Sequence, residues 1–385
     1  MKVTNDILYI GVNDHQIDLF EGQYPVPNGI SYNSYVIIDD KIAVLDTVDH
    51  NFTHEWLNNL ENALNGRKPD YLVVHHMEPD HSANIMVFMN KYSEAIIVSS
   101  LKAFNMMSNF FGSDFLDRRI VVSDNDALCL GKHTLRFYTA PMVHWPEVIM
   151  SYEENEKILF SADAFGTFGA LDVDQEWDSE ARRYYFGIVG KYGISVQALF
   201  KKLCNLDIKI ICSLHGQVLK ENICHYVNLY NIWSSYESEI DGIFIAYTSI
   251  YGNTKEAAQA LANKLKEKGY TNVVIKDLGR CDMSEAVAIA FSYSKLVIAS
   301  PTYNGDVFPP VKEFINHLTQ RAFKNKVVGF IENGSWSPNA IKVMKLMLES
   351  SKNLTYAVNE VKIMSALKEK NYLELEALAN ELIHN

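Results

Sequence analysis

The sequence lacks the features that mark membrane, secreted or nucleic-acid-binding proteins. No apolar run among its 385 residues reaches the roughly 18 residues that a transmembrane helix needs. The first residues, MKVTNDILYIGV, carry charges early and have no long apolar stretch behind a basic start, so no signal peptide is expected. A formal net charge of −12 disfavours nonspecific binding to nucleic acid. We therefore expect a cytoplasmic globular protein, with neither a membrane nor a nucleic acid as its partner.

Cysteine is scarce and shows no pairing pattern. The chain has five cysteines, an odd number, and no C-x-x-C pair. This excludes a disulfide framework and speaks against an iron–sulfur cluster or a zinc ribbon, because those sites need closely spaced cysteines. Free thiols in a reducing cytosol are the expected state.

Glycine-rich nucleotide motifs are missing as well, since neither G-x-G-x-x-G nor a Walker A sequence occurs. The segment TSIYGNT (248–254) offers another kind of phosphate site. It follows the strand-like run IFIAYTS and precedes a predicted helix from Thr254 to Lys268. A helix N-terminus with loop N–H groups and hydroxyls attracts an anion, and Gly252 allows close backbone approach. Taken alone, the segment is equally typical of an ordinary capped turn.

Two later loops favour a ligand site. SPTYNGD (300–306) and ENGSWSPN (332–339) also follow strand-like runs, and ligands bind outside the carboxyl ends of strands in open α/β sheets. Tyr303 and Trp336 are suited to stack on a flat ring system. This half closely resembles flavodoxin, and the resemblance implies FMN. The implied FMN-binding residues are Thr248, Ser249, Ile250, Tyr251, Gly252, Asn253, Thr254, Pro301, Thr302, Tyr303, Asn304, Gly305, Asn333, Gly334, Ser335 and Trp336.

Histidine is distributed unevenly and indicates two domains. Only His317 and His384 lie beyond residue 225, and a polar segment at 231–242 separates the two parts. We predict domains at 1–240 and 241–385. Many short strand-like runs with helices between them predict a β-sandwich covered by helices in the first part. Alternating strands and helices predict a doubly wound parallel sheet in the second.

The segment HHMEPDH (75–81) concentrates side chains that bind metals. It follows the apolar strand YLVV, and three more candidates, His144, Asp163 and His215, each follow a strand-like run. A lone histidine at a strand end is usually structural, but this constellation predicts a metal site. His75 stands outside the alternation of ligands, and we assign it a supporting or packing role.

This part resembles the metallo-β-lactamase fold, an αββα sandwich with a motif of the H-x-H-x-D-H type at one edge. Here Glu78 replaces the second histidine of that motif. The extra carboxylate makes a harder, more anionic site, which suits two iron ions bridged by Asp163, although zinc also binds such ligands.

Together the two halves resemble the flavodiiron proteins, in the class without a fused rubredoxin domain. The signatures are H-M-E-P-D-H, H-W-P-E at 144–147, D-A-F-G at 163–166, H-G at 215–216 and the flavodoxin loops. The resemblance implies one iron on His76, Glu78 and His144, a second on Asp80, His81 and His215, and Asp163 between them.

The same resemblance implies an activity and partners. The activity is reduction of dioxygen to water, of nitric oxide to nitrous oxide, or both, with electrons delivered through FMN. The implied partners are an external donor such as rubredoxin and a second copy of the chain, in a head-to-tail homodimer or a dimer of dimers.

Two other interpretations are possible from the sequence. One is a metallo-β-lactamase-like hydrolase fused to a flavodoxin-like electron-transfer module, against which Glu78 argues. The other is a pure electron carrier with a degenerate first half, against which the complete ligand set argues.

Overall fold

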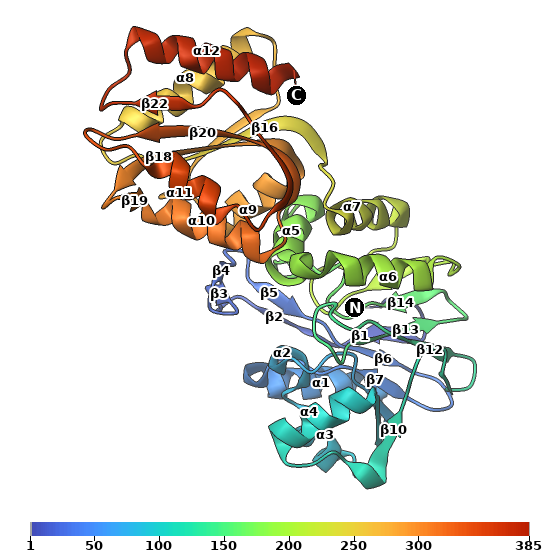
Figure 1. Ribbon diagram of the computed structural model, residues 1–385. Coiled ribbons are helices and arrows are strands. Elements are labelled where there is room, and N and C mark those ends of the chain that lie inside the picture. The colour runs from blue at the N-terminus through green and yellow to red at the C-terminus, as the bar shows by residue number, and fades with distance from the viewer. Residues whose placement is uncertain (1, 385) are drawn as a thin grey trace. The chain divides into compact units, whose positions relative to one another are not determined.

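The computed structural model describes residues 2–384 and divides into two compact units, residues 1–230 and 231–385 (Figure 1). Within the described residues, no helix is both long and apolar enough to cross a membrane.

The first unit is built around two mixed β-sheets. The larger sheet contains, in spatial order, β1 (Ile7–Tyr9), β6 (Tyr35–Ile37), β7 (Ala43–Leu45), β8 (Tyr71–Val73), β9 (Ile96–Ser99) and β10 (Arg119–Val121). The smaller contains β11 (Ala127–Cys129), β12 (Thr134–Thr139), β13 (Ile149–Glu153), β14 (Ile158–Phe160) and β15 (Ile210–Cys212). Two short antiparallel pairs are β2 (Val12–Asp14) with β5 (Ile30–Tyr32), and β3 (Leu19–Phe20) with β4 (Tyr24–Pro25).

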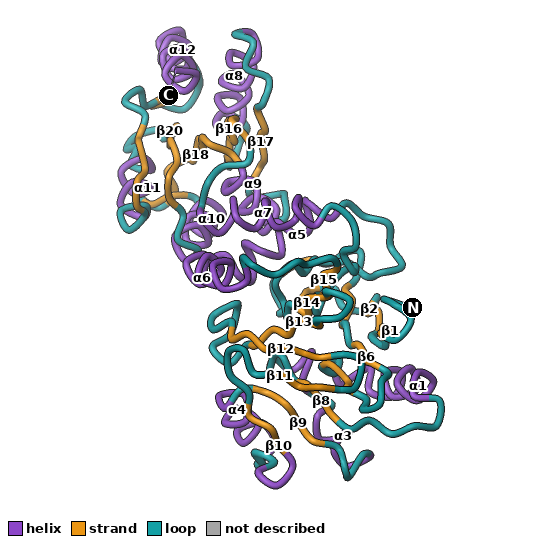
Figure 2. Tube along the Cα trace, turned by 90° about the vertical axis from the view of Figure 1, so that its right-hand side faces the viewer, coloured by secondary structure: helices purple, strands orange, loops and turns teal. Residues whose placement is uncertain are grey.

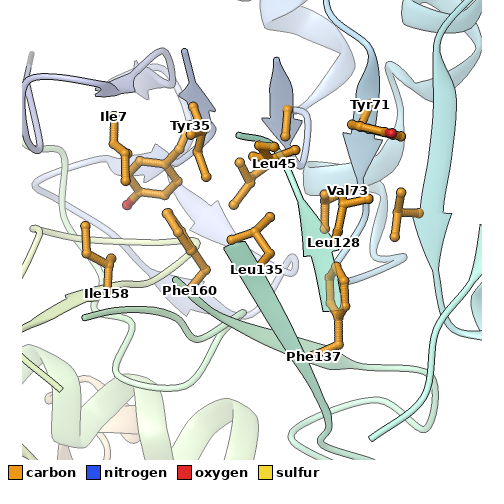
Figure 3. Close-up of a cluster of buried hydrophobic side chains, with 14 of the residues drawn as sticks. Ile7, Tyr35, Leu45, Tyr71, Val73, Leu128, Leu135, Phe137, Ile158 and Phe160 are labelled. Carbon is orange, nitrogen blue, oxygen red and sulfur yellow. The ribbon is translucent and has the colours of Figure 1, made fainter. Parts of the chain in front are cut away.

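The core of this unit lies between the two sheets (Figure 3). Successive side chains of a strand point to opposite faces, so alternate residues reach the same layer. Tyr35 and Leu45 of the larger sheet pack in one cluster with Leu135, Phe137 and Phe160 of the smaller. This burial of apolar faces explains why short strands without strong individual signals form a stable sandwich.

Helices complete the unit, and α1 and α4 show how the sequence specifies them. In α1, Trp56, Leu60 and Leu64 are buried at i, i+4 spacing. In α4, the Ser100 hydroxyl caps the N-terminus by accepting from Ala103 N, and Gly112 ends the helix at φ 69°. The helices are α1 (Thr53–Leu64), α2 (Pro79–Ser82), α3 (Ile85–Lys91), α4 (Leu101–Phe111), α5 (Trp177–Tyr184) and α6 (Gly193–Leu203), with short helices η1 (His50–Phe52), η2 (Leu116–Arg118), η3 (Tyr185–Val189) and η4 (Gly190–Tyr192). A further helix, α7 (Ile223–Ser235), begins in this unit and continues past its end at residue 230.

The second unit is a parallel sheet with helices on both faces. Its strands run in the order β17 (Val273–Asp277), β16 (Ile240–Tyr247), β18 (Tyr293–Tyr303), β20 (Lys324–Asn333) and β21 (Lys352–Tyr356), with β19 (Asp306–Val307) beside β18 and β22 (Val361–Ile363) beside β20. The helices are α8 (Asn253–Glu267), α9 (Met283–Ser292), α10 (Pro309–Gln320), α11 (Ala340–Met347) and α12 (Glu369–His384). Both Figure 1 and Figure 2 show α8 and α12 on one side of the sheet and α9, α10 and α11 on the other. The three strands β17, β16 and β18 are parallel, and the two that follow β16 in the chain lie on opposite sides of it, which makes the carboxyl end of β16 a switch point.

The predicted architecture, an αββα sandwich followed by a doubly wound parallel sheet, is confirmed. Two details differ. The helix predicted from Thr254 to Lys268 begins and ends one residue earlier. The apolar pattern of AVNEVKI (357–363) favours one continuous strand, but the chain forms β21 before this segment and only the short β22 at its end. The Glu381 carboxylate accepts from the backbone N–H groups of Val358 and Asn359, and these bonds take the backbone out of the sheet ladder.

Candidate metal centre and flavin site

The first unit brings all seven predicted metal ligands together. His76 and Glu78 lie on the loop after β8, and Asp80 and His81 follow in α2, which begins at Pro79. The three remaining residues, His144, Asp163 and His215, follow β12, β14 and β15 of the other sheet. The two sheets thus deliver ligands to one place from the ends of their strands.

The first group of ligand atoms surrounds one position. His76 Nε2 and His144 Nε2 lie 3.2 and 3.0 Å from Glu78 Oε2, and 3.1 and 3.2 Å from Asp163 Oδ2. Ligand atoms bound at about 2.0–2.2 Å to a common metal ion stand roughly 3.0–3.5 Å apart. These four side chains therefore have the spacing of a metal site.

The second group surrounds another position. Asp80 Oδ2 lies 3.3 Å from both His81 Nε2 and His215 Nε2, and the two imidazole nitrogens are 2.9 Å apart. Asp163 turns its other oxygen, Oδ1, toward this group, at 3.6 Å from His81 and 3.7 Å from His215. One carboxylate thus faces both positions, as a bridging ligand must. His81 points its ring into the group.

The chemistry of these side chains fits metal ions. Both oxygens of Asp80 and of Asp163 are buried without a hydrogen-bond partner, which is costly unless a cation takes that place. Burial would raise the pKa of Asp163, yet the neighbouring histidines hold it well below its usual range. Burial would lower the pKa of His144, but Asp163 and Glu78 raise it to about 9. Both shifts show that the cluster attracts positive charge.

Two buried carboxylates beside the ligands were not assigned from the sequence. Glu147, which lies in the H-W-P-E motif, accepts from His76 through Oε1, at 2.8 Å from Nδ1. Asp46, at the end of β7, accepts from both the backbone N–H and the ring of His75. No local pattern announces such partners, because they come from distant segments.

A third cluster combines Asp6, His133 and Glu156. The ammonium group of Lys132 lies 2.6 Å from Asp6 and 3.7 Å from Glu156, so a cation of the chain itself already balances the acidic groups. We therefore assign it no metal.

The loop between β16 and α8, at the switch point of the second unit, has the polar groups that an anion site needs. Gly252 has φ 98° and precedes α8, and its N–H donates to Ser249 Oγ at 3.0 Å. The Thr248 hydroxyl is buried and has no partner in the structure. A buried, unsatisfied hydroxyl on the loop that leads into a helix fits the phosphate of FMN, which would supply the missing partner.

A cavity of about 620 Å³ adjoins this loop. Residues from all three predicted loops line it: Ser249, Ile250, Tyr251, Asn253, Thr254, Pro301, Thr302, Tyr303, Asn304, Gly305, Asn333, Gly334, Ser335 and Trp336. Of the implied FMN residues, Thr248 and Gly252 do not line it. Tyr251 and Trp336 are 91% and 89% exposed, as expected for aromatic side chains that a bound ring would cover.

The structure adds Ser337, Asn339 and Ser365 to the lining of this cavity. Ser365 comes from the loop after β22, and its hydroxyl donates to Ser335 Oγ at 3.1 Å. The rule that ligands bind beyond strand ends also applies to this last strand, and it would have pointed to that loop.

Comparison with known proteins agrees with both domains. Residues 30–216 match the family model described as ODP family beta lactamase, and residues 244–376 match a flavodoxin domain. An uncharacterized protein of Methanocaldococcus jannaschii is 30% identical over 364 residues, which cover 93% of this chain and 91% of that protein. The anaerobic nitric oxide reductase flavorubredoxin of Salmonella arizonae is 29% identical over 91% of this chain and 75% of its own length. The chain belongs to the flavodiiron protein family.

Solved structures support this placement. The rubredoxin:oxygen oxidoreductase of the anaerobe Desulfovibrio gigas has a TM-score of 0.91 at 25% identity, over 100% of this chain and 98% of that one. The flavodiiron protein of Giardia intestinalis has the same fold, with a TM-score of 0.92 at 24% identity over 99% and 95% of the two chains. This flavodiiron protein is thus an oxidoreductase with a flavodoxin domain for FMN and a diiron centre.

Proposed function

We propose that this flavodiiron protein reduces dioxygen to water, nitric oxide to nitrous oxide, or both. The observation that carries the proposal is the pair of ligand groups that share Asp163, in one chain with a flavin cavity. Dioxygen takes up four electrons and four protons to form two waters. Two molecules of nitric oxide take up two electrons and two protons to form one nitrous oxide and one water. The bound iron ions and FMN supply the redox chemistry that amino-acid side chains lack.

The residues around the metal positions hold and enclose the centre. His76, Glu78 and His144 would hold one iron, Asp80, His81 and His215 the other, and Asp163 both. The rings of Phe20, Tyr32 and Tyr184 pack around the His215 imidazole, with centroid distances of 5.3, 5.9 and 5.6 Å. These apolar faces limit the water around that half of the centre, which strengthens electrostatic interactions between ligands and metal.

The residues of the second unit would hold FMN. The loop at 248–254 supplies a buried hydroxyl and the N-terminus of α8 for its phosphate. Tyr303 and Trp336 extend from the other two loops beside the same cavity, where the flat ring would lie.

Kinetics with each gas, added to protein reduced under anaerobic conditions, test the proposal. The protein, loaded with iron and FMN and supplied with reduced rubredoxin, should consume dioxygen or nitric oxide at rates well above those of the Asp163→Asn variant. A protein that holds about two iron ions and one FMN per chain and yet reduces neither gas would contradict the proposal. Zinc in place of iron, together with hydrolytic activity, would favour the fused-hydrolase interpretation instead.

We propose a cytoplasmic location, an external electron donor such as rubredoxin, and domain boundaries at 1–240 and 241–385. The names of two relatives support the donor, since one is a flavorubredoxin and another a rubredoxin:oxygen oxidoreductase. Both matched domains, at 30–216 and 244–376, lie within the proposed boundaries.

We also propose a head-to-tail homodimer, or a dimer of such dimers, in which the FMN of one chain serves the iron centre of its partner. Electron transfer needs the two cofactors close together, and a two-fold axis can bring them together across an interface.

Complementation tests whether electrons pass between chains. A chain that cannot bind FMN, through changes at 248–254, is mixed with a chain that cannot bind iron, through His76→Ala and Asp163→Asn. Verified heterodimers should regain activity at one of their two sites; inactive heterodimers with both cofactors loaded would exclude transfer between chains.

A further inference from the structure

The inner ligands of the two metal positions are equivalent in kind. Each position has two imidazole Nε2 atoms, one carboxylate of its own and one oxygen of the shared Asp163. The inner ligands therefore give no reason for one position to bind metal more tightly than the other. Any difference in affinity must come from the groups that hold these ligands, which orient the rings and tune their electron density.

The first position is backed by a buried carboxylate. Glu147 Oε1 lies 2.8 Å from His76 Nδ1 and also accepts from Met77 N at 2.9 Å, and both side chains of the His76–Glu147 pair are 0% exposed. Because a carboxylate only accepts, Nδ1 carries the proton and Nε2 keeps its lone pair for a metal. The Ser100 hydroxyl donates to the backbone carbonyl of Glu147, so the segment that carries this residue is anchored at the start of α4.

The second position has weaker support. His215 Nδ1 lies 2.8 Å from the backbone carbonyl oxygen of Ser31, a neutral acceptor. His81 Nδ1 is buried and has no hydrogen-bond partner at all. A neutral carbonyl draws the ring proton less than a carboxylate does, so His215 has a weaker acceptor behind it than His76 has.

We propose that Glu147 is a positioning residue that makes the His76–Glu78–His144 position the tighter of the two, so that the protein takes up its metal ions in a fixed order. The charge of Glu147 fixes the His76 ring and increases the electron density at Nε2. Outer partners of this kind are worth about 10–100-fold in metal affinity. The proposal rests on the metal centre proposed above, and it assigns the Asp80–His81–His215 position the metal that binds last and leaves first.

Stepwise loading of the wild-type protein gives the first test. Apo-protein with FMN bound is titrated anaerobically with Co²⁺ against a competing chelator, and with one and then two equivalents of ⁵⁷Fe²⁺ for Mössbauer spectroscopy. We expect two dissociation constants about 10–100-fold apart. We also expect one quadrupole doublet to dominate after the first equivalent of iron and a second doublet to appear with the next.

Three variants assign the constants to positions. In Glu147→Gln, the amide oxygen can still accept from His76 and Met77, so size and shape are kept while the charge is removed. The smaller dissociation constant should rise by about 10–100-fold and approach the larger one, which should stay unchanged. His81→Ala should weaken only the looser constant. The matched control is Glu153→Gln, which removes the charge from another buried imidazole–carboxylate pair, Glu153 Oε1 to His133 Nδ1 at 3.0 Å, and should change neither constant.

Several results would overturn the proposal. The first two are equal metal dissociation constants in the wild type and loss of the tighter binding step in His81→Ala. The other two are equal weakening of both binding steps in Glu147→Gln and an effect of Glu153→Gln as large as that of Glu147→Gln. The first two do not depend on whether Glu147→Gln folds. A protein that binds fewer than two metal ions per chain would instead refute the diiron centre itself.

Discussion

Asp46 holds the residue that precedes the first metal ligand. Its Oδ1 accepts from the backbone N–H of His75 at 2.7 Å, and its Oδ2 lies 2.5 Å from His75 Nδ1, with both side chains 1% exposed. The other ring nitrogen of His75 lies 2.8 Å from the Ser151 hydroxyl of β13. The pair therefore ties the loop at 75–78 to both sheets of the first unit.

We expect Asp46→Ala to destabilise the first unit and to lower its metal content. Loss of the carboxylate leaves two buried donors of His75 unsatisfied, at a cost of about 1–3 kcal/mol each. Chemical denaturation and metal analysis check this, with the exposed Asp40→Ala as a control that should change neither. Unchanged stability would mean that water replaces the carboxylate without loss.

Asp163→Asn should remove both metal ions while FMN stays bound. The two oxygens of Asp163 face different ligand groups, so loss of its charge weakens both positions. Flavin content should remain near that of the wild type, because the FMN loops belong to the other unit. Metal analysis and the absorbance of released flavin measure the two effects. Full retention of two metal ions would show that Asp163 is not the bridge.

Thr248→Val should weaken FMN binding without destabilising the protein that lacks FMN. The Thr248 hydroxyl is buried and unsatisfied in the structure, and a bound phosphate would give it a partner. We expect a loss of about 1.5–3 kcal/mol in FMN binding, which is the usual worth of a hydrogen bond to a charged group. Flavin titration and thermal denaturation of apo-protein provide the two measurements. Thr319→Val, which alters a hydroxyl bonded within α10, serves as the control.

Trp336→Ala should weaken FMN binding or shift its reduction potential. The indole is 89% exposed, so its loss costs the fold little, while contact with a bound ring is worth about 1–3 kcal/mol. Flavin titration and spectroelectrochemistry measure the effect, and Leu346→Ala, an exposed apolar residue of α11, is the control. If affinity and potential both match the wild type, Trp336 does not touch the flavin.

The stability of the second unit should rise with pH because of Lys326. Burial lowers the pKa of this amine to about 7, with Glu239 opposing the shift, and Nζ donates to Ser238 Oγ and to the Phe291 carbonyl at 2.6 Å each. An unfolded lysine titrates near about 10.4. Between the two values the unfolded chain binds the additional proton, so folding gains up to about 1.4 kcal/mol per pH unit as the pH rises.

Denaturation at pH 7.5, 8.5 and 9.5 measures this slope, which should be absent in Lys326→Met. Lys295→Met is the matched control. Burial disfavours the charge of Lys295, but its hydrogen bonds to Asp241 and Tyr270 raise its pKa, so it does not titrate in this window. A slope in Lys326→Met equal to that of the wild type would assign the effect to other groups.

The amino-acid sequence by itself determined which candidate ligands gather at one place and which three loops line the cavity of the second unit. The H-M-E-P-D-H ligands are contiguous, and TSIYGNT, SPTYNGD and ENGSW each follow an apolar strand, so local order was enough to place them at the ends of strands. The alternation of strands and helices likewise determined the class of each domain, because burial follows the periods of the two structures.

Only the tertiary structure decided what supports those ligands. Glu147 reaches His76 across 71 residues of sequence, and the Ser31 carbonyl reaches His215 across 184. Glu381 of the last helix interrupts a strand that the local sequence favours. Such contacts form when sheets and helices pack, and they depend on distances in space that no spacing along the chain encodes. The equivalence of the two inner ligand sets follows from the sequence, whereas the difference between their outer partners comes from the packed fold.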